Sequence, residues 1–361
     1  MTMLNRRALL GGTAAALAAG SGARAQPVTF AGRNIEFMIP FAEAGGSDIW
    51  ARFITPFIAR HLPGNPTVFV RNVPGGGSIT GANEFAQRVR PDGMTLFGAS
   101  ASTQLPFLLG DRRVRFDFRD WVPVLISPFG GVFYAHSRTG ISATDQIAQL
   151  RGQELIFPGQ TVTGLDVVPV LALHMLGMNV RYVWGMRGRG EARLALERGD
   201  ASVDHQTTPA FLTQVMPMVR EGNAVPLFSY GVVGADGRIV RDPSFPEIPT
   251  FEEVYERVHG RAPDGVIYDA YRACSVAAFA AQKPAVLKRD TPAPIIAAYR
   301  EAFQRLAADP ELVSTGGEVL GVYEQAVGDA ADTLYRLATT ISDDARRFIQ
   351  EFLTQNHNVR F

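Results

Sequence analysis

The sequence predicts an α/β protein built on doubly wound, mostly parallel sheets with helices on both faces. Short apolar runs alternate with amphipathic helical segments, and glycine-rich turns stand at the junctions between them. The chain is also rich in turn residues, with 36 Gly and 23 Pro among 361 residues. Strands that alternate with helices form parallel sheets with right-handed connections. A chain of this length can bury one large core or two.

The first βαβαβ unit lies near the start of the chain. Residues 35–39, 67–70 and 94–98 are short apolar runs that read as strands. Between them, apolar residues recur at helical spacing over 49–58 and 79–89. This order predicts three parallel strands joined by two helices.

The pattern continues through the rest of the chain. Further strands are expected at 122–126, 131–135, 155–157, 181–184 and 201–205. Helices are expected at 166–175, at 191–198, from 292 to about 306, and within 325–355. The run at 272–277 also reads as a strand, and its Cys274 is expected to be buried and inert.

Residues 1–25 are expected to be an export signal peptide. Arg6 and Arg7 precede an apolar stretch at 8–19, and an A-x-A cleavage motif follows at 23–25. The arginine pair fits a twin-arginine signal, and an ordinary Sec signal fits equally well. Without the three arginines of this segment, the 35 basic and 35 acidic residues leave a net charge of −3. That balance argues against nucleic acid or an anionic membrane as a partner.

Two glycine-rich turns, at 39–48 and 72–81, are the most informative local feature. Each stands between an apolar strand and a helix. Such turns bring backbone N–H groups and a helix N-terminus to one point, and this arrangement binds anions. Two of them in one βαβ unit predict a pocket for a small carboxylate.

Nucleotide binding and metal binding find little support in the sequence. In the second turn, Thr80 occupies the third glycine position of the G-x-G-x-x-G pattern, so no nucleotide cofactor is expected. The six histidines are scattered without metal-ligand spacing, so no metal site is expected.

The run at 98–102 resembles a nucleophile elbow, but Ser102 replaces its second glycine. Ser100 and Ser102 can offer hydroxyls to a ligand or simply cap the next helix. Arg187 and Arg189 can reach an anion or remain solvated. No catalytic residue is assigned, although a secreted hydrolase that uses Ser100 stays open as an alternative.

Five segments, in order and closely spaced at first, resemble the periplasmic solute-binding proteins of tripartite tricarboxylate transporters, the Bug family. They are Pro-Phe-Ala-x-x-Gly-Gly-Ser-Asp at 40–48, Asn-x-Pro-Gly-Gly-Gly at 72–77, Pro-Asp-Gly-x-Thr-Leu at 91–96, Asp-Trp-Val-Pro-Val at 120–124 and Pro-Glu-Ile-Pro-Thr at 246–250. The resemblance is strong over 35–125 and weaker over 155–210. In the weaker part, Trp184-Gly185-Met186 replaces the family's Tyr-Lys-Gly, and Val203-Asp204 comes two residues late.

The resemblance implies a two-lobed periplasmic-binding-protein architecture with a hinge of two crossings. Lobe I would comprise 26–127 and 252–361, and lobe II would comprise 128–251. Ligand would lie in the cleft between them, held by the loops that follow the first strands of each lobe. The implied ligand-binding residues of lobe I are Phe41, Ala42, Ala44, Gly45, Gly46, Ser47, Gly76, Gly77, Ser78, Ile79 and Thr80, together with Ser100 and Ser102. Those of lobe II are Thr161, Thr163, Gly164, Trp184 and Arg187.

The function that this resemblance implies is the capture of a small carboxylate outside the cytoplasmic membrane. The ligand would be a di- or tricarboxylate, an amino acid or an aromatic acid, delivered by a monomer to the permease subunits of the transporter. Besides the hydrolase, a sensor that docks to a receptor instead of a permease remains an alternative.

Overall fold

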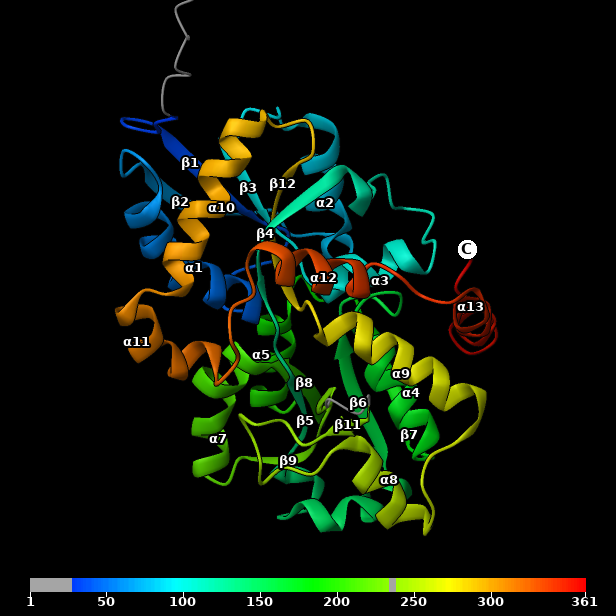
Figure 1. Cartoon of the computed structure of the whole chain (residues 1–361). Coiled ribbons are helices and arrows are strands. Elements are labelled where there is room, and N and C mark those ends of the chain that lie inside the picture. Colours follow the sequence, from blue (N-terminus) through cyan, green and yellow to red (C-terminus); the bar gives the residue numbers. More distant parts are fainter. Residues whose placement is uncertain (1–27, 234–237) are drawn as a thin grey trace, which may run out of the picture.

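In the computed structural model, which describes residues 28–233 and 238–361, the chain forms two lobes joined through their middle (Figure 1). The signal peptide expected at 1–25 lies outside the described residues. Each lobe is an α/β unit with a parallel-containing sheet, as the sequence predicts.

The sheet of the first lobe has the strand order β2-β1-β3-β12-β4. Its strands are β1 (Asn34–Ile39), β2 (Thr67–Asn72), β3 (Thr95–Gly98), β4 (Trp121–Ser127) and β12 (Lys283–Lys288). β1 pairs in parallel with both β2 and β3, which confirms the predicted βαβαβ unit. β12 comes from far along the chain and runs antiparallel to both β3 and β4.

The second lobe repeats this arrangement with its own inserted strand. It contains β5 (Gly131–His136), β6 (Glu154–Gly159), β7 (Asn179–Trp184), β8 (Val203–Thr207) and β9 (Ala224–Ser229). β6 pairs in parallel with β7, whereas β5 runs antiparallel to both β8 and β9. The backbone N–H of Ser202, just before β8, donates to Ile156 O of β6 at 3.0 Å, which places the two groups of strands side by side. Antiparallel pairing therefore takes a larger share of this lobe than expected. A short hairpin, β10 (Val232–Val233) and β11 (Ile239–Val240), stands apart.

Helices cover both faces of the first sheet. The longer ones are α1 (Gly46–His61), α2 (Ile79–Arg88), α10 (Ala293–Ala307), α11 (Pro310–Leu320) and α12 (Gly328–Ala338). Helix α3 (Ala101–Leu108) follows β3, but its buried hydrophobic residues belong to a hydrophobic cluster shared with the second lobe. Side chains of α1, α10 and α11 form one hydrophobic cluster with the sheet, and those of α2 and α12 form another. This layering follows from the apolar stripe on each helix, which must be buried against the sheet.

The second lobe carries α4 (Val167–Met175), α5 (Arg189–Arg198), α6 (Thr208–Ala210), α7 (Met216–Arg220), α8 (Phe251–His259) and α9 (Gly265–Phe279). The prediction of a strand at 272–277 is wrong, because these residues lie in α9. Cys274 is buried in that helix, as expected, and burial raises the pKa of its thiol to about 12.

Two connections between the lobes can be traced along the chain. The first lies at residues 128–130, between β4 and β5. After residue 251, however, α8 and α9 pack in one hydrophobic cluster with β5, β6 and α4, and the C-terminal α13 (Asp343–His357) lies beside α9 (Figure 1). The chain re-enters the first sheet only at β12. We therefore propose that the second lobe extends to about residue 280 instead of 251.

Across the two described stretches of chain, no helix has both the length and the apolar character needed to cross a membrane.

Candidate ligand site between the lobes

The N-terminus of α1 lies at the junction of the lobes. The helix begins at Gly46 directly after the first glycine-rich turn, and no side chain caps it at Gly45. Asp48 does not act as the cap, because its Oδ2 accepts the N–H of Ala44, 2.9 Å away, and so fixes the turn. The first N–H groups of α1 and the positive end of its dipole therefore face the second lobe.

A small cavity of about 20 Å³ lies at this junction. The first lobe contributes Phe41, Gly45, Gly46, Ser47, Ser100, Ser102, Gln282 and Lys283, and the second lobe contributes Gln160, Leu165, Arg189 and Thr207. A volume of this size accommodates about one water-sized group. A carboxylate-bearing ligand is larger than this volume, so its entry would require the lobes to move apart.

Gly46 explains why the first turn needs glycine at its end. A Cβ at this position would lie 2.3 Å from Thr207 Oγ1 of the second lobe. The neighbouring Gly45 likewise faces the backbone of Gly190, across the same junction. The glycines thus allow the two lobes to approach closely at the point where the helix N-terminus lies.

On the side of the second lobe, a buried charge cluster holds the loop after β6. Asp166 Oδ2 accepts the N–H of Gln160 at 2.6 Å and, more weakly, that of Thr161. Its Oδ1 accepts from Arg189 Nη1 at 3.0 Å and pairs with His205 Nε2 at 2.9 Å. Burial raises the pKa of Asp166, but Arg189 and the hydrogen bond from His205 outweigh that effect and hold the pKa below its usual value.

Arg189 is fully engaged within this cluster. Besides Asp166 it contacts Asp204, and it donates to the carbonyl oxygens of Pro158 and His205. Its side chain is 8% exposed. The sequence left open whether Arg189 is solvated or binds an anion. In the structure its guanidinium is buried and paired with protein carboxylates, and the residue also lines the cavity.

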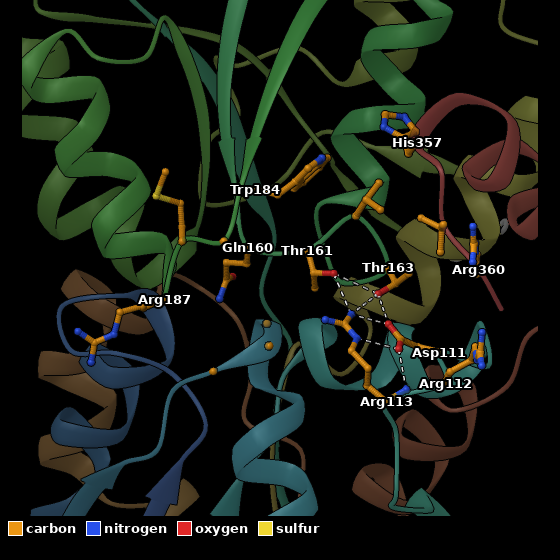
Figure 2. A pocket seen from close by; sticks show the side chains of 17 residues that line it. Asp111, Arg112, Arg113, Gln160, Thr161, Thr163, Trp184, Arg187, His357 and Arg360 are labelled. Atoms are coloured by element: carbon orange, nitrogen blue, oxygen red, sulfur yellow. Dashed lines mark hydrogen bonds and ion pairs between the residues drawn. The ribbon is translucent and has the colours of Figure 1, made fainter.

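A larger pocket of about 530 Å³ opens beside the cavity, between the second glycine-rich turn and the loops of the second lobe (Figure 2). Gln160 belongs to the walls of both. Trp184 lines the pocket and stacks on Tyr182, with ring centroids 5.3 Å apart. Arg187 lies on the same wall and is exposed.

Four side chains link the lobes across this pocket (Figure 2). Arg113 Nη2 donates to Asp111 Oδ2 at 2.6 Å and to Thr161 and Thr163 Oγ1 at 3.1 and 3.2 Å. Thr163 Oγ1 in turn donates to Asp111 Oδ2 at 2.6 Å. Burial raises the pKa of Asp111, but the hydrogen bonds from Arg113 and Thr163 more than offset it, so the pKa lies below its usual value. We call Asp111, Arg113, Thr161 and Thr163 the inter-lobe latch.

The residues expected to bind ligand fall into three groups. Phe41, Gly45, Gly46, Ser47, Ser100 and Ser102 line the cavity, whereas Gly76, Gly77, Thr161, Thr163, Trp184 and Arg187 line the larger pocket. Ala42, Ala44, Ser78, Ile79, Thr80 and Gly164 line neither.

Members of the third group have other roles that the structure shows. Ala42 N–H donates to Arg187 O across the junction at 3.3 Å. Ser78 Oγ donates to Ser102 O at 3.1 Å, and Ile79 is buried in a hydrophobic cluster. Ser100 lines the cavity but is also a helix cap, because its Oγ accepts the N–H of Ser102 at 3.1 Å.

Sequence reasoning missed several residues of the cavity wall. Lys283 begins the returning strand β12, which the sequence does not predict as a strand, and Gln282 directly precedes it. Thr207 ends β8. The sequence nevertheless distinguishes Lys283. Only two of the 35 Lys and Arg residues are lysines, and they are the first and last residues of the run 283–288, which is apolar between them.

Known proteins resemble this chain in sequence and in structure. No family model matches the chain. Protein BugT of Bordetella pertussis is 27% identical over 250 residues, which span 65% of this chain and 70% of BugT. The structure of the periplasmic binding protein BugD superposes with a TM-score of 0.68 at 16% identity, covering 90% of this chain and 97% of BugD.

Two solved structures from Rhodopseudomonas palustris contain bound acids. MatC with malate has a TM-score of 0.65 at 18% identity and covers 88% of this chain and 98% of MatC. Rpa4515 with adipate has a TM-score of 0.67 at 17% identity and covers 90% of this chain and 97% of Rpa4515.

Two α/β lobes, each with an inserted antiparallel strand, and a cavity between them give the chain the fold of the periplasmic binding proteins. Within that fold, the chain is similar to BugT in sequence and to BugD in structure.

Proposed function

We propose that this protein captures a small carboxylate between its lobes in the periplasm and delivers it to the permease subunits of a tripartite tricarboxylate transporter. The observation that carries the proposal is the uncapped N-terminus of α1 at the inter-lobe cavity. Exposed N–H groups and the helix dipole favour an anion there. The malate and adipate in two structurally similar proteins agree with this choice of ligand.

The mechanism is closure of the lobes around the ligand. Ligand that contacts both lobes stabilises only the closed arrangement and so shifts the population toward it. Moving that equilibrium from 1:99 to 99:1 requires about 5.5 kcal/mol of differential binding. Several charge-assisted hydrogen bonds of roughly 1.5–3 kcal/mol each supply a free energy of that order.

The proposal includes a cleavable signal peptide at 1–25 that directs export of the protein by the twin-arginine or the Sec route. It also holds that the protein carries out no covalent chemistry on its ligand. Ser100 Oγ serves as a helix cap, and among the described residues it has no hydrogen bond to a histidine or an aspartate. A Ser100-dependent hydrolase would need such a partner.

A ligand panel tests the proposal directly. Mono-, di- and tricarboxylates, amino acids and aromatic acids are added to the purified mature protein, and thermal unfolding and calorimetric binding are measured. Saturation at 100 times Kd should add about 2.7 kcal/mol of stability. If no member of the panel raises the melting temperature or releases heat, the proposal is wrong.

Gly46→Ala locates the site within the protein. The added methyl collides with Thr207 across the junction, so closure around the ligand should fail and binding should weaken more than tenfold. Gly152→Ala is the matched control, because a Cβ at Gly152 has no atom within 4 Å. Equal affinity of the two variants would place the ligand elsewhere.

A further inference from the structure

Lys283 is a buried cation without a carboxylate partner. It is the first residue of β12, pairs with Ser127 of β4, and is only 3% exposed. Its Nζ donates to Gln282 Oε1, and within residues 28–233 and 238–361 no acidic side chain forms an ion pair with it. Buried ammonium groups are normally paired, so an isolated one in a cavity wall calls for an explanation.

The composition of the chain strengthens this point. Of the 35 Lys and Arg residues only two are lysines. The other, Lys288, stands at the opposite end of the same strand and donates to the carbonyl oxygens of Ala86 and Val89 at 2.7 and 2.9 Å. A lysine is a compact charge that can lose its proton when buried, which arginine cannot do.

Other donors around the cavity also lack acceptors. The side-chain amide nitrogens of Gln160 and Gln282 are buried without a hydrogen-bond partner, and these residues are 6% and 0% exposed. Because Gln282 Oε1 accepts from Lys283, its amide nitrogen is oriented as a donor. Three unsatisfied or weakly satisfied donors from both lobes suit a ligand group that only accepts hydrogen bonds, and an ionised carboxylate is such a group.

The remaining charged groups near the cavity do not supply a free cation. Arg189 is paired with Asp166 and Asp204. His205 behind it is neutral at physiological pH, because burial and Arg189 lower its pKa to about 4. On the first lobe, Asp48 of α1 is engaged by Arg52. Lys283 is thus the one unpaired charge in the wall of this cavity among the residues described.

We propose that Lys283 Nζ binds a carboxylate of the ligand directly, as the counter-charge on the floor of the inter-lobe cavity. This inference rests on the proposed function and names the residue that selects an acid over a neutral solute. The carboxylate would accept from Lys283 and from the amides of Gln160 and Gln282 while the N-terminus of α1 faces it.

Proton uptake follows from this pairing. Burial lowers the pKa of Lys283 to about 7. A bound carboxylate favours the charged amine and raises that pKa again, so above pH 7 binding should take up close to one proton. Affinity should therefore fall by up to about tenfold per pH unit above pH 7, until the pKa of the bound state is reached.

The first test compares acids with neutral analogues. Calorimetry measures the wild type, Lys283→Met and Lys288→Met against malate, adipate and the uncharged diamide of adipate. Lys283→Met should weaken the binding of the acids roughly ten- to a hundredfold, as expected for loss of a charge-assisted hydrogen bond, and Lys288→Met should not. Thermal melts show whether each variant is folded.

Unchanged acid affinity in Lys283→Met, or equal affinity of the wild type for acid and diamide, overturns the inference but leaves the proposed function standing. If the wild type binds no acid of the panel, both fail.

The second test follows the proton. Titrations at pH 8 in buffers of different ionisation enthalpy should show uptake approaching one proton in the wild type and none in Lys283→Met. Lys283→Arg keeps its charge at all these pH values, so its affinity should not change between pH 7 and 9.

Because the chain has only two lysines, labelling lysine with ¹⁵N gives two side-chain signals, and the Lys288→Met spectrum assigns them. A Lys283 signal that does not respond to a bound acid contradicts the proposal.

Discussion

At the scale of single residues, the candidate site depends on a buried histidine that stays neutral. His205 Nε2 lies 2.9 Å from Asp166 Oδ1, and its Nδ1 lies 3.1 Å from the hydroxyl of Tyr230. This network assigns the proton to Nε2, since Nδ1 can then accept from Tyr230. Asp166, held in this way, positions the N–H groups of Gln160 and Thr161 at the junction of the lobes.

The histidine makes the fold sensitive to acid. Burial lowers the pKa of His205 from 6.5 to about 4, so between these values the unfolded chain binds a proton that the folded chain does not. Stability is therefore lost as the pH falls through this window, by at most on the order of 3 kcal/mol from this residue. Urea unfolding at pH 7 and pH 4.5 should show a smaller loss in His205→Gln than in the wild type. Equal losses would mean that His205 is not neutral in the folded protein.

At the scale of elements, the second glycine-rich turn has a role different from the one expected. The sequence predicts that this turn binds an anion through its backbone N–H groups, whereas in the structure its Gly77 faces the second lobe. It has a φ of +67°, and a Cβ there would lie 2.2 Å from Thr161 Cγ2. The glycine is thus required both by the backbone conformation and by the close approach of Thr161.

A matched pair of variants separates these two requirements. Gly77→Ala should lower stability by about 1 kcal/mol through backbone strain and should also weaken ligand binding, because the methyl keeps the lobes apart. Gly140→Ala has the same strain at φ +86° but meets no atom within 4 Å, so only stability should fall. Adding Thr161→Ser to Gly77→Ala removes the colliding methyl and should restore part of the affinity. Binding by Gly77→Ala at wild-type affinity would contradict this role.

How far the sequence predicts an element depends on where that element is buried. Strands such as 35–39 were recognisable because a parallel strand buried on both faces is a short apolar run bounded by turn residues. The sequence predicts a strand at 272–277 where helix α9 lies, because α9 packs against α3, α4 and α13 and shows no polar stripe there. The loops after β1 and β2 were predicted as site elements from local glycine patterns. Lys283 and Thr207 were not, because only the tertiary return of β12 and β8 brings them to the cavity.

At the scale of the whole molecule, the proposed mechanism requires the two lobes to move as units. β12 returns to the first sheet and β5 starts the second, so each lobe is completed by a strand adjoining a connection between lobes. The cavity and the latch lie between these units, where few covalent links cross. A ligand that contacts both lobes therefore either replaces some of the direct contacts between the lobes or stabilises the closed arrangement in addition to them.

The inter-lobe latch is a polar part of those contacts, and it should set how strongly closure is favoured before ligand contributes. Thr163→Val removes the hydroxyl that donates to Asp111 and accepts from Arg113, while it preserves the shape of the side chain. Loss of hydrogen bonds to charged groups costs roughly 1.5–3 kcal/mol, so the closed population should fall and Kd should rise about ten- to a hundredfold.

Distance measurements distinguish this latch role from direct ligand contact by Thr163. Spin labels at exposed Arg90 of the first lobe and Glu221 of the second report the separation of the lobes with and without adipate. If Thr163 acts in the latch, Thr163→Val should lengthen the distance in the absence of adipate, and saturating ligand should restore it. A variant with weakened binding but an unchanged distance distribution would instead make Thr163 a ligand contact. In that case, closure of the lobes would depend on the ligand alone.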